Sequence, residues 1–487
     1  MNKQINIGWA QTNITPPGKI YVEGQLFDRI STYVHDPLTA TCLVLENGDD
    51  QMTIVSVDMP AVPGCHLPDL KARLAEEVEG LDVEKLVFCA IHTHNSTMFL
   101  AESTSESFRD VLGDITPDPV LPDDMMSAEE LKAFFLEKMT ALIADAWEAR
   151  YPGGISTAHD YAAVAFNRRP QFMIDGKVES KMYGTCSEPN FLGFEGSSDH
   201  SADMLYTWDT DGNLTGVAVC IPCPSQVYEL HNFLSADYWG ETRNFIREEM
   251  GNIFVLPMCG AAGDQNPLDL VRISKDNKEE LKVWNAQETA VFRAFDMLQE
   301  CRDIGERICE AVLRGYRKAK NYIETRPAFR TNCFEMDLPL RKVDKADVDA
   351  AQARIDAVKA RYAPGEKMTE GEMIRCFEDK GYIQRWAMQQ TMDRYSFNVY
   401  VFRIGQAVVA TNPFELYVDY SYRMKARCKA KQAFIVQLCS PGGGGYLPTR
   451  AAVAGGSYGS KPVSTKVGPD GGDELVEKTL AAMDQLF

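Results

Sequence analysis

The chain has 487 residues, of which 45% are hydrophobic and 25% charged, and it carries a formal net charge of −20. This length is enough for two or three domains or for one large domain with insertions. The acidic balance excludes a nucleic-acid partner, which needs a basic surface, and it would repel an anionic membrane. We therefore expect a small-molecule substrate, with neither nucleic acid nor a membrane as a partner.

The N-terminal residues 1–8 contain no long apolar run, so we expect neither a signal peptide nor a membrane anchor. The thirteen cysteines are odd in number and lie mostly inside apolar runs such as 87–90 and 217–220. Reduced, buried thiols of this kind are typical of a cytoplasmic protein and not of a disulfide framework. The sequence therefore predicts a cytoplasmic location.

Hydrophobic patterns in the first 260 residues predict alternating hairpins, helices and strands. In chain order these are a hairpin over 38–57, a helix over 67–78, a strand over 86–90, a long helix that a capping box opens at Ser127, a hairpin turn at 209–213, a strand over 214–221, a helix over 238–250 and a strand over 253–258.

The second half predicts further helices and strands, namely a helix over 286–320, a charged helical block over 344–394, a strand over 399–410, a helix over 416–430, a strand over 433–438 and a final helix over 473–487. No sequence repeat and no clear linker is visible, which favours one mixed α/β domain over 1–487. We expect 268–326 and 344–394 to be helical insertions. They would either cover a cleft or form a homo-oligomer interface, and both alternatives stay open.

Two of the seven histidines, His92 and His94, directly follow the predicted strand over 86–90. On an extended segment, side chains two residues apart point to the same face. Imidazole is both a common metal ligand and a common general base. The pair therefore predicts a catalytic or metal site, although two polar residues that merely end a strand fit the pattern equally well.

Several predicted strands end in small, polar or metal-binding residues. Because active sites lie on loops at the ends of a rigid sheet, we expect these junctions to converge on one cleft. They are Val55–Asp58, His92–Asn95, Cys220–Ser225, Cys259–Pro267 and Asn412–Glu415.

Cys220 and Cys223 form a pair with three functional interpretations. A redox pair would open a helix, whereas Pro224 and Ser225 continue into a loop. A structural zinc site would need a second pair of this spacing, which the sequence lacks. Cys223 alone can serve as a thiolate ligand, and two packed structural thiols remain an equal alternative.

Two further loops and one arginine are candidate substrate contacts. The small residues of 263–267 would let backbone N–H groups approach an oxyanion, and the glycine-rich loop 440–449 would let Tyr446 reach inward. Arg168 offers a guanidinium that can anchor an anion. A plain turn and a surface arginine are the alternatives.

Together these residues resemble the amino-terminal catalytic domain of the neutral/alkaline non-lysosomal ceramidase family. The matching motifs occur in the family's order along nearly the whole chain. They are Ile7–Ala10, Ile14–Pro17, His35–Ala40, His92–His94, Asn167–Arg168, Gly263–Asp264 and Gly445–Thr449. The resemblance implies a single ceramidase-like catalytic domain over 1–487.

The family is a zinc amidase that cleaves the N-acyl bond of ceramide, and two histidines, a glutamate and a tyrosine hold its zinc. By this resemblance, His92 is the first ligand, Glu415 the glutamate ligand and Tyr446 the tyrosine ligand. His94 is implied to contact the substrate or transition state, and Arg168 to be the active-site arginine.

The sequence departs from the family at three places. Cys223, followed by a proline, stands where the second histidine ligand is expected, with His231 as the fallback. Asn266 replaces the family's serine, so hydrolysis would depend on metal-activated water. Asn95 follows His94 where the family has serine. The family's immunoglobulin-like carboxyl-terminal domain is expected to be absent, which makes a small soluble substrate the better prediction.

We therefore predict a metal-dependent hydrolase of an amide or related bond in a small polar metabolite, with zinc or another divalent transition metal. The predicted metal ligands are His92, Cys223, Glu415 and Tyr446; the catalytic residues are His94, Asp264, Asn266 and Arg168; and the substrate contacts are Arg168, Asn95 and Gln265. The alternatives are a metal-dependent lyase, isomerase or epimerase, and a non-catalytic protein that binds a small molecule.

Overall fold

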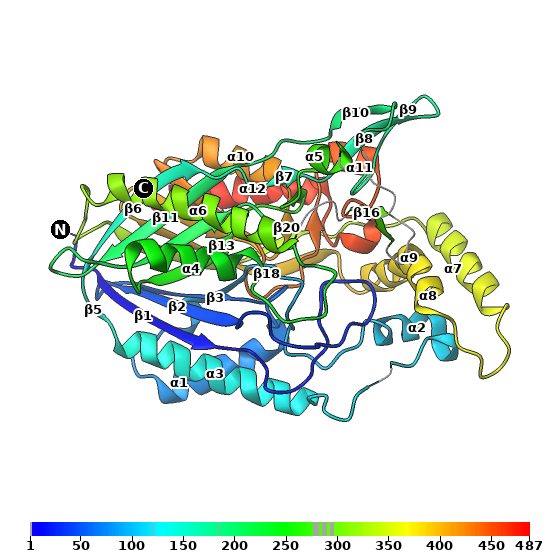
Figure 1. The fold of residues 1–487 in the computed structure, drawn as a ribbon, viewed down its shortest axis with the longest axis horizontal. Helices are drawn as coiled ribbons and strands as arrows, with labels where there is room; N and C mark the ends of the chain where they lie inside the picture. Colours follow the sequence, from blue (N-terminus) through cyan, green and yellow to red (C-terminus); the bar gives the residue numbers. More distant parts are fainter. Residues whose placement is uncertain (1, 120, 185, 276–281, 285–289, 293–296) are drawn as a thin grey trace.

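Three β-sheets form the centre of the protein in a computed structural model that describes all residues except 1, 120, 185, 276–281, 285–289 and 293–296 (Figure 1). The first sheet has the strand order β4-β3-β2-β1-β5, the second β13-β12-β11-β6 and the third β17-β18-β19-β21. The strands are β1 (Asn6–Asn13), β2 (Thr39–Glu46), β3 (Gln51–Val57), β4 (Leu86–Ala90) and β5 (Tyr151–Pro152); β6 (Gly154–Tyr161), β11 (Ser201–Trp208), β12 (Leu214–Ile221) and β13 (Phe254–Cys259); and β17 (Phe329–Pro339), β18 (Arg394–Ile404), β19 (Ala407–Thr411) and β21 (Gln432–Val436).

The three sheets share one topology, although no repeat is visible in the sequence. In each, the first three strands are antiparallel neighbours, and a helix then leads to a fourth strand that is parallel to the third. We call these repeats unit 1 (6–148), unit 2 (154–319) and unit 3 (329–484). Their connecting helices are α1 (Leu67–Glu77), α4 (Tyr238–Met250) and α10 (Val418–Arg427), and a second helix follows each fourth strand: α3 (Ala128–Glu148), α6 (Met297–Ala319) and α12 (Pro469–Asp484).

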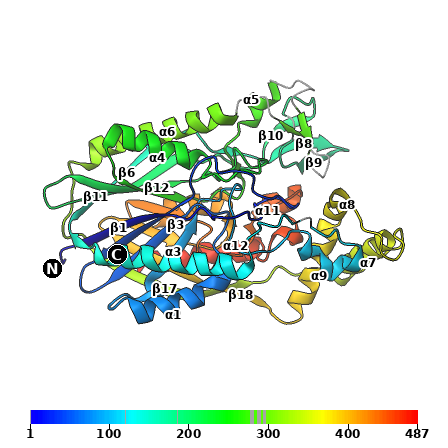
Figure 2. The ribbon, with the colours of Figure 1, turned by 60° about the horizontal axis from the view of Figure 1, so that its bottom comes forward.

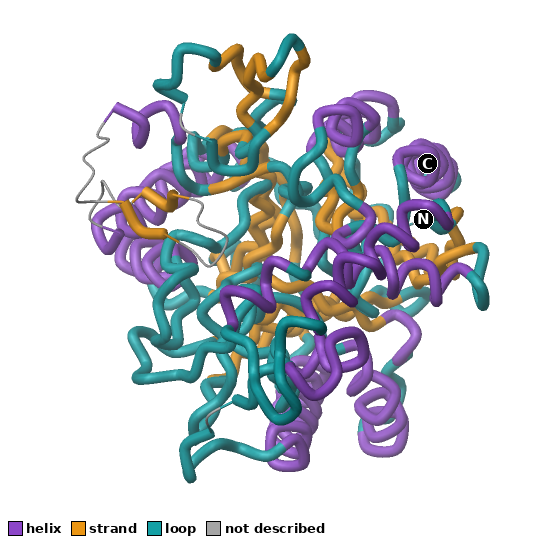
Figure 3. The backbone as a smooth tube through the Cα atoms, turned by 90° about the vertical axis from the view of Figure 1, so that its right-hand side faces the viewer, coloured by secondary structure: helices purple, strands orange, loops and turns teal. Residues whose placement is uncertain are grey.

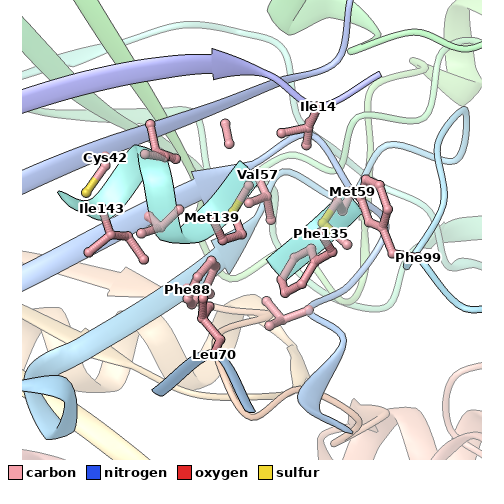
Figure 4. Packing of buried hydrophobic residues seen from close by; sticks show 14 of the residues in the cluster. Ile14, Cys42, Val57, Met59, Leu70, Phe88, Phe99, Phe135, Met139 and Ile143 are labelled. Carbon is pink, nitrogen blue, oxygen red and sulfur yellow. The ribbon is translucent and has the colours of Figure 1, made fainter. Parts of the chain in front are cut away.

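The helices of each unit cover the outer face of its sheet. Figure 2 shows α1 and α3 on one side of the molecule and α4 and α6 on the other. In unit 1, Leu70, Phe88 and Phe135 pack in the layer between sheet and helices (Figure 4). The inner faces of all three sheets meet in a shared core, to which β1, β11 and β18 each contribute. Burial of this apolar surface is the main force that joins the units.

Most predicted elements are confirmed, including the hairpin over 38–57, the capping box at Ser127 and the helix over 238–250. The single strand predicted over 399–410 is wrong. Gly405 has a φ of 59°, which glycine adopts without steric cost, and the chain turns back so that Ile404 pairs with Ala407. The helix predicted over 286–320 corresponds to α6, which begins only at Met297. The first part of the prediction is wrong where the structure describes it, because β16 (Ala290–Phe292) is a strand there, and 286–289 and 293–296 lie outside the described residues.

Between its first and second strands, each unit sends out a long excursion at one end of the molecule. Unit 1 contributes 14–38, and unit 2 contributes β7 (Phe166–Asn167), β8 (Pro170–Ile174), β9 (Lys177–Ser180) and β10 (Phe191–Phe194). Unit 3 contributes α7 (Lys345–Lys359), α8 (Glu370–Arg375) and α9 (Phe377–Gln389), which lie far from both termini in Figure 1.

The carboxyl ends of the third and fourth strands emerge at this same end, because these strands run parallel to the first strand of their unit. Figure 3, viewed from this end, shows loops in front of the strand ends. The topology therefore directs polar loops from all three units to one place. Within the described ranges, no helix has the length and apolar character needed to cross a bilayer.

Candidate active site

The fourth strands of the three units meet at their carboxyl ends. Cys89 of β4 forms a bridge with Cys439, which follows β21, and Gly260 after β13 forms a bridge with Val436. The backbone N–H of Gln437 donates to the carbonyl of Cys259 at 3.0 Å. The predicted convergence of strand-to-loop junctions is thus confirmed for the ends of β4 and β13, and the end of β21, which was not among the predicted junctions, joins them.

His92 and His94 meet at this junction, but not by the predicted geometry. The strand ends at Ala90, and His92 has a φ of 65°, a left-handed conformation that is uncommon outside glycine. The turn brings the two imidazole rings to a centroid distance of 4.8 Å at 79°. The expectation of an extended segment is therefore wrong, although the two rings do face each other. Such backbone strain is found preferentially at functional sites.

Glu415 and Tyr446 lie beside His92. Glu415 of β20 (Glu415–Leu416) pairs in parallel register with Tyr446 of β22 (Tyr446–Leu447). His92 Nε2 is 3.4 Å from Glu415 Oε2. Arg168, from the excursion of unit 2, donates to the Tyr446 phenol oxygen at 2.9 Å and lies 4.0 Å from Glu415. Units 1, 2 and 3 thus each contribute to one polar cluster.

The charges of the cluster stabilise one another. Burial alone would raise the pKa of the Glu415 carboxyl, but His92, Arg168 and Tyr446 outweigh it and hold that pKa below its usual value. Burial raises the pKa of Tyr446 well above the usual value despite Arg168, so the phenol remains neutral. An ionised Glu415 is therefore held between a cation, an imidazole and a phenol.

His94 is surrounded by residues that the sequence motifs did not single out. The amide nitrogen of Gln226 is 2.7 Å from His94 Nε2, and Glu229 Oε2 is 3.5 Å from Nδ1. A Cβ at Gly24, whose φ is 103°, would clash with the His94 ring. Burial, with His92 and Arg29, lowers the pKa of His94 well below its usual value. Gln226 and Glu229 belong to the loop after β12, just beyond the predicted junction Cys220–Ser225.

Cys223 lies within the core of unit 2. Its thiol donates to the carbonyl of Val164 at 3.2 Å, and its own carbonyl accepts from the hydroxyl of Tyr238 at 2.7 Å. Burial, together with Cys259 and Asp237, raises the pKa of the Cys223 thiol well above its usual value. A protonated thiol engaged in this way is not prepared to bind zinc, which requires the thiolate. The ring of His231, the fallback ligand, stacks on Phe233.

The remaining predicted residues support the loops around the cluster. Asn95 donates to the carbonyls of His231 and Phe233, and Gln265 donates to the carbonyl of Ser197. Asp264 accepts from Asn167 and from the backbone N–H of Val418, and burial raises its pKa to about 6.

Asn266 donates to the Tyr183 hydroxyl at 2.8 Å, and that tyrosine lines the cavity. Asn95, Asp264, Gln265 and Asn266 are not among the described residues that line the cavity. Direct substrate contact by these four residues stays a prediction.

A cavity of about 380 Å³ opens above the cluster, within the range typical of small-molecule sites. Every unit contributes to its wall. Its lining includes Gly24 to Phe27 and His94 from unit 1; Arg168, Met182, Tyr183, Gln226, Glu229 and Leu230 from unit 2; and Ile374, Arg375, Phe377, Glu378, Tyr446, Ser457, Tyr458 and Lys461 from unit 3. The helical block over 344–394 therefore covers the cleft, one of the two arrangements considered for it.

The cluster has the donor chemistry to hold one metal ion. His92 Nδ1 donates to the carbonyl of Pro60 at 2.6 Å, which leaves Nε2 as the nitrogen that would bind a metal ion, as in metal-binding histidines whose other ring nitrogen is held by a carbonyl. The 3.4 Å between His92 Nε2 and Glu415 Oε2 matches the separation of about 3.4 Å between two ligands of a tetrahedral ion. The described residues contain no group of three or more His, Cys, Asp or Glu placed to hold a metal, so Tyr446 would have to be a ligand.

Three units of one topology that enclose a His, Glu, Tyr and Arg cluster define a mixed α/β protein with an enzyme-like cleft. The fold is similar to that of neutral ceramidase from Pseudomonas aeruginosa, with a TM-score of 0.68, 16% sequence identity and coverage of 100% of this chain and 75% of that chain. A ceramidase complexed with C2 is similar over the same shares, with a TM-score of 0.66 and 15% identity. No family model matches the chain, and no curated protein matches it by sequence.

The resemblance to neutral ceramidases that the ordered motifs indicated is confirmed at the level of the fold. One mixed α/β domain is also confirmed, because the similarity extends over the whole chain.

Proposed function

We propose that the chain is a hydrolase that cleaves an amide or related bond of a small polar molecule. The convergence of His92, Glu415, Tyr446 and Arg168 in one polar cluster, of which Arg168 and Tyr446 line the cavity, is the observation that carries this proposal. Similarity of the fold to two ceramidases supports it. The sequence resemblance, which implies roles for the same four residues, supports it as well. The modest cavity volume and its mixed charged and aromatic wall favour a small polar substrate.

We further propose a single divalent metal ion, zinc or another transition metal, held by His92, Glu415 and Tyr446. Such an ion would polarise the carbonyl of the substrate and lower the pKa of water. Support comes from the orientation of His92 Nε2 toward Glu415 and from the bond of Nδ1 to the Pro60 carbonyl. Cys223 is left out of this set because its thiol is already engaged by Val164.

The protein's own side chains would orient the substrate and transfer the proton of the attacking water. Arg168 holds the Tyr446 phenol and balances the charge of Glu415, which fixes the geometry of the floor. His94 lines the cavity and is neutral, because burial lowers its pKa. Its Nε2 would accept the proton of the attacking water and return it to the leaving group.

Metal content per chain, measured by elemental mass spectrometry after purification without chelator or nickel, tests this proposal. We expect about one divalent metal in the wild type and in the control His159→Ala, a histidine that pairs with Asp203 away from the cavity. His92→Ala and Glu415→Ala should lose most of it. Full metal content in both variants would reject the ligand set.

The reaction itself is tested with a panel of small polar amides in water enriched with oxygen-18. Hydrolysis incorporates the label into the acid product, whereas a lyase, isomerase or epimerase does not. Turnover without incorporation would favour that second class of reaction, and binding of panel members without turnover would favour a small-molecule-binding protein. Arg168→Met should abolish turnover if the cluster is the reaction centre.

A cytoplasmic location is also part of the proposal. It is supported by the thirteen cysteines, all of which are free in the structure.

A further inference from the structure

Glu229 is a largely buried carboxylate that faces His94 across one wall of the cavity. We propose that Glu229 is a positioning residue for His94: its carboxylate holds the proton on Nδ1, which leaves Nε2 as the proton acceptor. This role rests on the proposed hydrolytic function, in which His94 transfers a proton. Carboxylates that orient a catalytic imidazole in this way fix both its tautomer and its ring direction.

The contacts of His94 define which nitrogen carries the proton. An amide nitrogen can only donate, so the 2.7 Å contact from Gln226 makes Nε2 of His94 an acceptor. The neutral ring must then carry its proton on Nδ1. This buried nitrogen has no hydrogen-bond partner among the described residues, and Glu229 Oε2 lies 3.5 Å from it. An unpaired buried donor carries a free-energy penalty, which a small approach of the carboxylate would remove.

The ring of His94 has little freedom to turn away from Glu229. Gly24 packs against the ring so closely that a Cβ there would clash with it. The carbonyl of His94 accepts from Arg29 Nη2 at 2.6 Å, which fixes its backbone. His92 Nε2 lies 3.4 Å from His94 Nε2, so the proton-accepting nitrogen faces the cluster. Movement toward Nδ1 therefore has to come from Glu229.

The backbone of Glu229 is anchored independently of its carboxylate. Its carbonyl accepts from Arg29 Nη1 at 2.8 Å and from Gln25 Nε2 at 3.2 Å. The neighbouring Tyr228 N–H donates to Asp237 at 2.8 Å. Because the loop is held through its main chain, a change of the Glu229 side chain tests the carboxylate and not the loop.

Two nearby arginines favour the charged form of the Glu229 carboxylate, whereas burial disfavours it. Burial raises the pKa of Glu229 to about 6, while the nearby charges of Arg168 and Arg29 oppose this rise. At neutral pH the group is therefore mainly ionised and able to accept from Nδ1–H of His94. A purely structural carboxylate would need no exposure to the cavity, yet Glu229 is part of its wall.

The experiment is nitrogen-15 NMR of histidine side chains in the metal-loaded protein, with the His94 signals assigned by their loss in His94→Asn. We expect His94 to be protonated at Nδ1 in the wild type and in Glu300→Met, a buried carboxylate of α6 that pairs with Arg272 far from the cavity. Glu229→Met should lose this tautomer preference, and kcat on the best amide of the panel should fall 10- to 100-fold at unchanged metal content. Glu229→Gln should restore the tautomer in part, because its amide oxygen still accepts.

His94 protonated at Nε2 in the wild type, or an unchanged tautomer in Glu229→Met, would overturn the inference. Failure of the hydrolase proposal has a different signature: no panel member is turned over, while the tautomer of His94 still depends on Glu229. If Glu229→Met does not fold, the comparison of Glu229→Gln with Glu229→Asp decides, since the shorter side chain cannot reach Nδ1 and should lose the preference.

Discussion

Arg168 of unit 2 donates a hydrogen bond of 2.9 Å to the phenol oxygen of Tyr446 in unit 3, and both side chains are buried. The same guanidinium donates to the carbonyl of Gly263 at 2.9 Å and lies 4.0 Å from Glu415. One side chain therefore joins two units at the floor of the cavity. Removal of the Arg168 cation would leave the buried negative charge of Glu415 with less positive charge beside it.

Arg168→Met is accordingly expected to destabilise the protein by about 3–5 kcal/mol, the cost of breaking a buried charge pair from one side. The free energy of unfolding, measured by chemical denaturation, tests this. The control is Arg394→Met, an exposed arginine that pairs with Asp337 and Glu474 and should cost less than about 1 kcal/mol. Equal effects of the two substitutions would contradict a compensating role for Arg168.

Cys223→Ala is expected to keep the metal content of the wild type, because its thiol is bound to the Val164 carbonyl and remains protonated. The substitution should cost about 1–3 kcal/mol of stability, through a lost hydrogen bond and lost packing in a buried site. Tyr446→Phe, which retains the ring, is the matched comparison and should lower metal content. Loss of metal in Cys223→Ala would instead support Cys223 as the thiolate ligand that the family resemblance implies.

Local sequence patterns predict most of the helices and strands correctly. Apolar runs around an Asn-Gly step indicate the first hairpin, and the polar residues after β4 and β13 predict that these two strand ends share one cleft. The end of β21 was not among the predicted junctions, although it bridges to both. The hairpin between β18 and β19 was missed because Gly405 and Gln406 interrupt a long apolar run without a strong turn signal.

No local sequence pattern indicates the repeated topology of the three units or the contacts of Gln226 and Glu229 with His94. The three units share an order of strands and helices, which different apolar residues satisfy equally well, so no sequence periodicity marks them. Gln226 and Glu229 reach His94 from more than 130 positions away. Their contact depends on how the loop after β12 packs against 23–29, which neither spacing nor composition specifies.

Gly24→Ala is expected to lower activity more than it lowers stability, because the added methyl group would push the His94 ring out of place. Gly113→Ala is the matched control, since that glycine also has a positive φ, of 66°, but has open space around its Cβ position. Both variants should lose about 1 kcal/mol from backbone strain. A drop in kcat of at least tenfold is expected in Gly24→Ala alone, and equal kcat values would show that the ring tolerates displacement.

The last prediction concerns Glu23, the residue before Gly24. Burial raises the pKa of its carboxyl from 4.5 to about 8, although the Met98 N–H that it accepts opposes the rise. Between these two values the folded state keeps a proton that the unfolded state releases. The free energy of unfolding should therefore fall as pH rises from about 5 to 8, by at most about 1.4 kcal/mol per pH unit from this group.

Glu23→Gln removes this titration while it keeps an acceptor for the Met98 N–H, so the variant should gain stability relative to the wild type as pH rises through that window. Below about pH 4.5 the two proteins should differ little, because the wild-type carboxyl is then protonated in both states. Chemical denaturation at pH 4.5, 6, 7 and 8 measures the difference, with Glu137→Gln as the control for removal of an exposed charge. If the difference in the free energy of unfolding between the two proteins stays constant over this range, Glu23 is ionised in the folded protein. A positive charge that moves toward Glu23 would then compensate for its burial.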